Sequence, residues 1–347
     1  MCNNSNMKDG NLLHTLILFC LVTACLPAIS CNNNIDTNSL ENDILVLTTK
    51  IPLAGVNGRI DHLTYDSVHH LVFVAALGNN TVEVVNTITN QRVHTITGLH
   101  GPQGVCYIPS VNRLVVANGD NGDCVFYECI NYSVIKHIQL SGDADNTRFD
   151  AANNIVFVGY GDGGISVIDV VKMEQVATIQ LDGHPESFQL DEVNNKLFIN
   201  VPDAHEIQVA SLKTHQVIGT WKNDGASANF PMALDANNKR LFVVYRHPAS
   251  IKVLNTETGQ VIQSIRCSGD ADDIFYDNLS GLLFVSCGDG FIDAVKMSGG
   301  DYKLINHIKN SSGARTSLWI PSEKKLLLAV PVRGGNDAAL WVYKLKP

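Results

Sequence analysis

The sequence is short of aromatic residues and of positive charge. Aromatic side chains make up 7% of the 347 residues, and 25 Lys and Arg stand against 34 Asp and Glu, so the formal net charge is -9 at pH 7. A chain of this sign is repelled by polyanions, which argues against nucleic acid as a partner. Charged residues account for only 17% of the chain and hydrophobic residues for 45%, a balance that excludes intrinsic disorder and favours a folded protein with a large core.

Several motifs with known chemistry are also absent. There is no Gly-x-Ser-x-Gly elbow, no His-Glu-x-x-His, no phosphate-binding Gly-x4-Gly-Lys-Ser/Thr loop, no Cys-x-x-Cys and no Cys/His zinc spacing. Five cysteines follow residue 100, an odd number. A bridge between Cys267 and Cys287 is one option in an oxidising compartment, but we expect these five to be small buried hydrophobic residues: Cys106, Cys124, Cys129, Cys267 and Cys287.

Residues 1–31 have the pattern of a signal peptide. An apolar stretch follows Lys8 and is interrupted by polar residues, so it is a poor match to the roughly 20 apolar residues of a membrane-spanning helix. Val22-Thr23-Ala24-Cys25 resembles a bacterial lipoprotein box, and the residues that end at Cys31 match it more loosely; the alternative is an ordinary cleaved leader. Asn-rich residues 32–42 indicate a flexible tether. We expect export to the periplasm or cell envelope, with membrane attachment only through a lipid on Cys25 or Cys31.

A short hydrophobic segment recurs seven times in the rest of the chain. The copies begin 43, 41, 42, 44, 42 and 43 residues apart, within the period of roughly 40 to 45 residues that is typical of four-stranded propeller blades. They are residues 71–74, 114–117, 155–158, 197–199, 241–243, 283–285 and 326–328.

The residues around each copy predict the remaining strands of a blade. An Asp-led turn precedes five of the copies, as in Asp150-Ala-Ala-Asn-Asn, and two further strand-like segments follow, as in 165–169 and 175–179. The seventh repeat lacks a fourth strand, and residues 44–51 have the pattern of one without a blade. We therefore predict an all-β fold: one seven-bladed β-propeller over residues 43–347, a monomer whose ring is closed by an N-terminal strand.

These repeats resemble a known family. Residues 165–169 followed by 175–179 are similar to the YVTN-type repeats of exported bacterial and archaeal propellers, the YncE-like group, and the resemblance covers nearly the whole chain after the leader. It implies an exported propeller, but members of this group share no established reaction. The Trp-Asp signature of WD40 blades is absent.

The first strand of each blade is expected to line the central channel, so the starts of these strands share one mouth. Aligned on the repeats, the equivalent positions are Asp61, Gly104, Asp145, Glu186, Phe230, Asp272 and Thr316, of which four are carboxylates. With their neighbours they give a set of ligand-binding candidates: Asp61, His62, Gln103, Asp145, Asn146, Arg148, Glu186, Asn229, Arg246, Asp272, Asp273 and Arg315.

Carboxylates that face one narrow opening repel each other, and a cation or basic side chains can relieve this. One hypothesis places calcium or magnesium on Asp61, Glu186 and Asp272, because hard cations prefer oxygen ligands. The alternative is that the acids pair with nearby arginines: Arg59, Arg148 and Arg315.

Two classes of function follow from this sequence. The first is a binding or scaffold module without a reaction, whose mouth takes an envelope protein, a glycan or a small polar ligand. The second is a cation-dependent hydrolase or isomerase acting on a lactone or sugar acid, with His62 or Asp273 as base. A propeller that binds a redox quinone is not favoured, since no stacking Trp or adjacent-Cys platform is evident. A fold alone does not decide between these classes.

Overall fold

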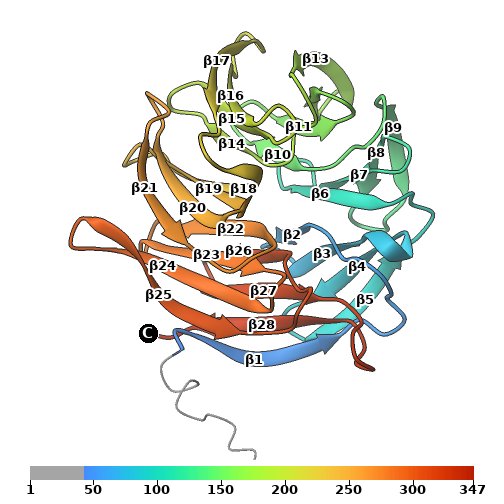
Figure 1. Cartoon of the computed structure of the whole chain (residues 1–347). Coiled ribbons are helices and arrows are strands. Elements are labelled where there is room, and N and C mark those ends of the chain that lie inside the picture. Colours follow the sequence, from blue (N-terminus) through green and yellow to red (C-terminus); the bar gives the residue numbers. More distant parts are fainter. Residues whose placement is uncertain (1–42) are drawn as a thin grey trace, which may run out of the picture.

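The computed structural model describes residues 43–347, which form seven antiparallel sheets of four strands each. The predicted signal peptide, both lipidation candidates and the predicted tether lie outside the described residues. Figure 1 shows the sheets following one another around a common centre. This confirms the predicted seven-bladed β-propeller.

Each blade runs from an inner first strand to an outer fourth strand. Blade one consists of β2 (Leu63–Asp66), β3 (Leu71–Ala76), β4 (Thr81–Asn86) and β5 (Gln91–Ile96). Blade two consists of β6 (Pro102–Ile108), β7 (Arg113–Asn118), β8 (Asp123–Glu128) and β9 (Val134–Gln139). Blade three consists of β10 (Thr147–Asp150), β11 (Ile155–Tyr160), β12 (Gly164–Asp169) and β13 (Glu174–Gln180). Blade four consists of β14 (Phe188–Asp191), β15 (Lys196–Val201), β16 (Glu206–Ser211) and β17 (Val217–Lys222). Blade five consists of β18 (Ser227–Asp235), β19 (Arg240–His247), β20 (Ala249–Asn255) and β21 (Val261–Arg266). Blade six consists of β22 (Ala271–Asp277), β23 (Leu282–Cys287), β24 (Phe291–Ser298) and β25 (Asp301–Lys309). Blade seven holds β26 (Ser317–Ile320), β27 (Lys325–Val330), β28 (Ala339–Leu345) and β1 (Leu45–Pro52), and the one described helix is the 3-10 turn η1 (Leu77–Asn79).

The ring closes between the two ends of the chain. Strand β1 pairs antiparallel with β28, with Leu45 opposite Leu345 and Ile51 opposite Leu340, so the last sheet has the order β1-β28-β27-β26. In Figure 1 the blue β1 lies beside the red β28. The predicted orphan strand over 44–51 therefore supplies the missing fourth strand, and blade seven has no unpaired edge at β28.

The seven recurring segments become the second strands of the blades, and their side chains form the core. Seven clusters of buried hydrophobic residues each draw on two neighbouring blades. In one of them Phe73 of β3 packs with Val105 of β6 and Val116 of β7. Burial of each blade's apolar face thus requires its neighbour, which is why the repeat is stable only as a ring.

The Asp-led turns connect first and second strands as predicted. Asp150 Oδ1 accepts a 3.0 Å hydrogen bond from the amide of Asn153, and Asp235 Oδ1 accepts one of 3.1 Å from the amide of Asn238. Asp side chains favour such turns because they bond the backbone two or three residues further on. The turns fix where each first strand ends, and so the register of the residues that face the channel.

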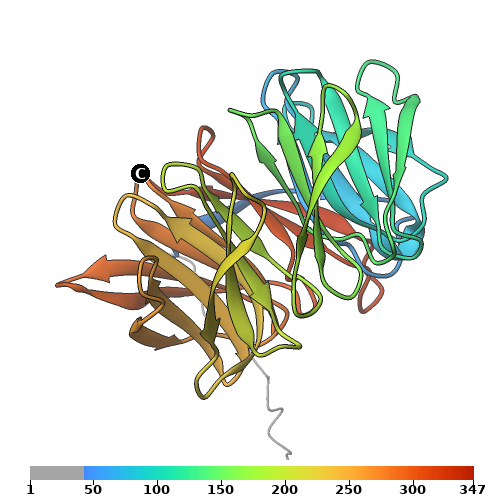
Figure 2. The same cartoon turned by 90° about the horizontal axis from the view of Figure 1, so that it is seen from above.

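The five cysteines of the described part are free, with Cys106, Cys124 and Cys287 buried. Within residues 43–347 the Cys267–Cys287 bridge does not form, and the expectation of buried cysteines holds for three of the five, because Cys129 and Cys267 are only partly buried. Figure 2, turned by 90°, shows the early blades in blue to green on one side and the later ones in yellow to orange on the other. Within residues 43–347, no helix has the length and apolar character to cross a membrane.

Candidate functional site

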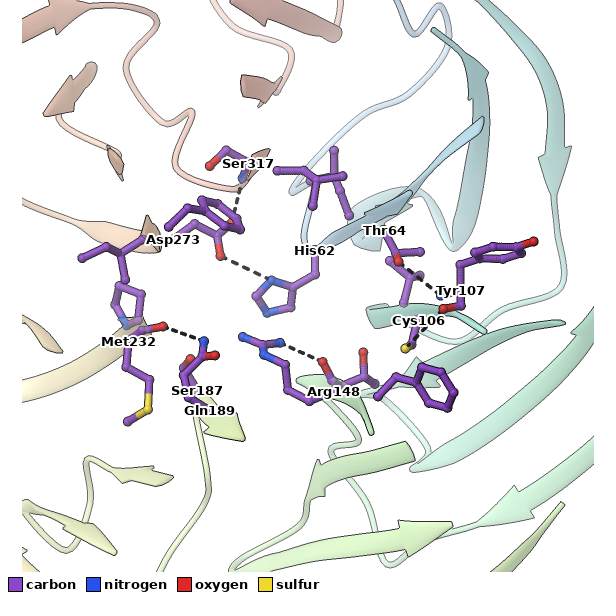
Figure 3. A pocket seen from close by; sticks show the side chains of 18 residues that line it. His62, Thr64, Cys106, Tyr107, Arg148, Ser187, Gln189, Met232, Asp273 and Ser317 are labelled. Atoms are coloured by element: carbon purple, nitrogen blue, oxygen red, sulfur yellow. Dashed lines mark hydrogen bonds and ion pairs between the residues drawn. The ribbon is translucent and has the colours of Figure 1, made fainter. Parts of the chain in front are cut away.

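The centre of the ring holds a cavity of about 390 Å³, which we call the channel cavity. All seven first strands, or the residues next to them, contribute to its lining, as the sequence alignment of the blades predicted. Figure 3 shows several of the side chains involved. Its polar lining includes His62, Thr64, Arg148, Ser187, Gln189 and Asp273.

One residue earlier along the same strands lies a ring of charged side chains, which we call the entrance layer. It consists of the charged residues Arg59, Asp61, Asp145, Glu186 and Asp272, together with the uncharged Phe230. The space left between them is only about 10 Å³, roughly what a single water requires. The layer is therefore nearly filled by its own side chains, and the room for a larger ligand lies deeper.

Arginines neutralise part of the entrance layer. Arg59 Nη2 lies 2.8 Å from Asp61 Oδ2. Asp272 receives two arginines, with Arg246 Nη2 at 2.7 Å from Oδ1 and Arg315 Nε at 2.9 Å from Oδ2. The predicted pairing of the acids with Arg59 and Arg315 is confirmed. The third arginine that pairs with them is Arg246, whereas the hypothesis had named Arg148.

Burial also shifts the pKa values of the carboxyl groups in the entrance layer. Removal from water raises the pKa of Asp61 to about 6 and that of Glu186 to about 7, although Arg59 and His184 respectively oppose these shifts. Burial, followed by repulsion from Asp61 and Glu186, raises the pKa of Asp145 well above its usual range. The Oδ1 atom of Asp145 is buried and has no hydrogen-bond partner. The entrance layer thus holds carboxyl groups that retain protons at unusually high pH.

His62 lies below this layer among three carboxyl groups. Its Nε2 is 3.8 Å from both Asp61 Oδ1 and Asp145 Oδ1, and its Nδ1 is 3.8 Å from Asp273 Oδ1. The Asn146 amide is 3.1 Å from Nε2. Burial, with help from the positive charge of Arg148, lowers the pKa of His62 to about 4. The imidazole is therefore neutral near pH 7.

Arg148 is the arginine of the channel cavity. Its Nη1 donates to the Asn146 side chain and, at 2.7 Å, to the Thr147 carbonyl. Among residues 43–347, no carboxylate lies within 4.0 Å of its guanidinium. Burial dominates and lowers the pKa of Arg148, whereas for Arg315 burial is outweighed by Asp272 and Asp270, which raise the pKa. Figure 3 shows the Arg148 guanidinium group directed into the middle of the cavity.

Asp273 completes the charged groups of the cavity. Its Oδ2 accepts a 2.7 Å hydrogen bond from the Ser317 amide. Burial raises its pKa well above the usual range, despite that bond. Asp273 is directed toward the Ser317 amide and His62, and within residues 43–347 it forms no ion pair with Arg148.

The structure separates the predicted ligand-binding candidates, and all but Asn229 lie in three places. Five lie at the entrance layer or pair with it: Asp61, Asp145, Glu186, Asp272 and Asn146. Arg246 and Arg315 reach this layer from outside it, and Gln103 lies at the exposed rim, where its Nε2 donates to Asp143 Oδ1 at 2.9 Å. His62, Arg148 and Asp273 face the channel cavity.

Asn229 lies elsewhere. It is fully buried and lines neither space; its Nδ2 donates to Asn200 Oδ1 and to the Glu206 carbonyl, both at 3.0 Å. The pairing of β18 with β19 is irregular between Asn229 and Met232. An irregularity of this kind re-aims side chains, which explains why counting back from the repeat misplaces this one.

Two of the aligned positions carry no charge for structural reasons. Gly104 approaches the neighbouring blade so closely that a Cβ there would lie 1.9 Å from the Asp145 carbonyl oxygen. Thr316 is buried, and its hydroxyl donates to the Ile60 carbonyl at 3.1 Å. These positions join blades rather than face a ligand.

Sequence analysis did not identify Thr64 and Gln189 as candidates. Thr64 lies two residues beyond the candidate His62, and Gln189 lies two residues beyond Ser187, which follows the candidate Glu186. Period-two alternation of a strand places such residues on one face. That alternation is the signal that could have found them.

The geometry gives no support to the predicted cation site. Among residues 43–347, no group of three or more His, Cys, Asp or Glu side chains is arranged to hold a metal ion. Asp61 and Asp272, two of the three proposed ligands, have arginine partners. The calcium or magnesium hypothesis remains a prediction from sequence.

Comparison with known proteins gives the fold. No family model and no curated protein matches the sequence. A chain of Kuenenia stuttgartiensis hydrazine synthase is similar in structure, with a TM-score of 0.72 and 14% identity over 83% of this chain and 98% of that one. A chain in the crystal structure of the mitotic checkpoint complex is similar with a TM-score of 0.74 and 14% identity, covering 96% of this chain and all of that one. At this identity the likeness shows a seven-bladed β-propeller.

Proposed function

We propose that this protein is an exported binding module that holds a small polar ligand in the channel cavity. The observation that carries the proposal is the cavity itself, which all seven blades line and whose volume of about 390 Å³ lies within the range of small-molecule sites. Its polar groups converge from separate blades, as in sites that orient a ligand. Export rests on the signal-peptide pattern of residues 1–31 and on the resemblance to exported propellers.

Binding fits the cavity better than catalysis does. Burial raises the pKa of Cys106 to about 12, so this thiol is not a nucleophile at neutral pH. The Ser317 hydroxyl shares a 2.7 Å hydrogen bond with the Ser286 hydroxyl, and within residues 43–347 it has no hydrogen bond to a carboxylate or an imidazole. The described lining therefore lacks an activated nucleophile. One neighbour in structure belongs to a complex, which supports binding as a use of this fold.

The test is a ligand panel read by thermal shift and calorimetry. The panel contains neutral sugars, polyamines and organic acids, and we expect at least one class to raise the melting temperature of the native protein. Ser187→Phe fills the cavity and should abolish the shift. Val193→Phe places the same ring on an outer turn where Val193 is 90% exposed, so it should leave the shift intact. A panel in which no member binds, or equal binding by both variants, would refute the proposal.

A further inference from the structure

Within the proposed binding role, on which this inference rests, we propose the class of the ligand. The geometry points to a small hydroxylated organic carboxylate whose carboxylate is held by Arg148.

Arg148 differs from the other three arginines at the centre of the ring. Arg59, Arg246 and Arg315 each lie within 2.9 Å of a carboxylate oxygen. Arg148 has no such partner among the described residues, although it lines the channel cavity. A guanidinium remains charged in proteins, and removal from water is costly unless an anion accompanies it. A ligand that brings its own negative charge would remove this cost.

The Arg148 guanidinium has N–H donors that form no hydrogen bond within residues 43–347. Both protein hydrogen bonds of the Arg148 side chain come from Nη1, to Asn146 and to the Thr147 carbonyl. The Nε and Nη2 groups have no hydrogen-bond partner in residues 43–347, and Figure 3 shows the head directed into the cavity. Nε and Nη2 form one edge of the planar fork that binds a carboxylate through two parallel hydrogen bonds.

Nearby acids compete weakly for that fork. Asp273 is directed toward the Ser317 amide and His62, and its Oδ1 lies 3.8 Å from His62 Nδ1. Burial raises the pKa of Asp273 well above its usual range, which disfavours its charged form, and lowers that of His62 to about 4, so the imidazole is neutral near pH 7. The positive charge of Arg148 is therefore available to a bound anion.

The rest of the lining selects an organic, hydroxylated anion over a bare oxyanion. Gln189 donates through Nε2 to the Met232 carbonyl at 2.8 Å, which leaves its carbonyl oxygen to accept a hydroxyl. Thr64 Oγ1 accepts from the Tyr107 amide at 3.2 Å and keeps its own proton to donate. Apolar side chains such as Met232 and Ile274 line the same space. Sulfate or phosphate would leave these groups and most of about 390 Å³ unused.

The experiment compares gluconate with glucose, which has the same number of carbons and no carboxylate, and with inorganic phosphate and sulfate. We expect calorimetry to show gluconate binding at least about tenfold tighter than glucose, and no competition from phosphate or sulfate at equal concentration. Arg148→Gln should weaken gluconate by about tenfold or more and leave glucose unchanged. Arg240→Gln, the same substitution at a partly exposed arginine outside the channel, should bind as the native protein does.

Each other result has a defined meaning. Glucose binding as tightly as gluconate, or full affinity in Arg148→Gln, would overturn the carboxylate inference and leave the binding role standing. Displacement by phosphate or sulfate would replace the organic acid by an inorganic oxyanion. Absence of binding by every panel member would refute the binding role itself. If Arg148→Gln does not fold, Arg148→Lys keeps the charge without the fork and should still lose affinity for gluconate relative to the native protein.

Discussion

At the scale of single residues, the channel shows how charge can be buried in layers. Asp61 and Asp272 have arginine partners, whereas Glu186 has no ion pair within residues 43–347. Removal from water is the main cause of the raised pKa of Glu186. Each such group links folding to pH. A carboxyl group with a raised pKa holds its proton more tightly in the folded than in the unfolded state, so its contribution to stability falls as pH rises between the two values.

Glu186→Gln tests this linkage. The pKa of Glu186 is raised from 4.5 to about 7. The free energy of unfolding of the native protein should therefore fall as pH rises from 4.5 to about 7. Glutamine cannot ionise, so the variant should resemble the native protein near pH 4.5 and be more stable near pH 8. One pKa unit corresponds to ~1.4 kcal/mol, and after screening by solvent at the entrance we expect about 1–2 kcal/mol. Urea unfolding at both pH values measures the difference.

The control for this prediction is Glu192→Gln, because Glu192 is exposed on the turn between β14 and β15. It should show no gain that depends on pH. A gain of equal size at both pH values in Glu186→Gln would point to better packing instead, and would contradict the linkage.

At the scale of elements, the blades themselves were predictable and side-chain partners were not. The 41- to 44-residue period located all seven second strands, because each must bury the same apolar face. Counting back from them placed Asp61 and Glu186 in one layer. The count failed at Asn229, where the irregular pairing of β18 is invisible in composition. Counting along the sequence also did not predict that Arg246, and not Arg148, contacts Asp272, because this contact depends on the distance between blades.

Ring closure by β1 can be tested within the strand. Ile51 is fully buried in the cluster shared by blades seven and one, whereas Leu47 on the same strand is 37% exposed. Ile51→Ala should lower the free energy of unfolding by about 2–4 kcal/mol through lost burial and an unfilled cavity. Leu47→Ala should cost less than about 0.5 kcal/mol. Chemical denaturation measures both, and similar small losses would mean that β1 does not close the ring.

At the scale of the whole molecule, fold and location rest on different parts of the chain. Residues 43–347 account for the propeller and for the proposed ligand site. The proposed export and the predicted membrane attachment rest on the sequence pattern of residues 1–31. A lipid on Cys25 or Cys31 would hold an otherwise ordinary propeller at a membrane, because acyl chains partition into the bilayer at about 0.8 kcal/mol per methylene.

Fractionation of cells that express the full chain tests this arrangement. The native protein should appear in the membrane fraction and be released by detergent but not by salt, since the anchor is hydrophobic. Cys25→Ala or Cys31→Ala alone should release it if that cysteine carries the lipid, and metabolic labelling with a fatty acid should disappear in the same variant. Cys106→Ala, a change at a buried cysteine of β6, should alter neither. A protein that remains soluble, or that stays on the membrane after both cysteines are replaced, would contradict the lipid anchor.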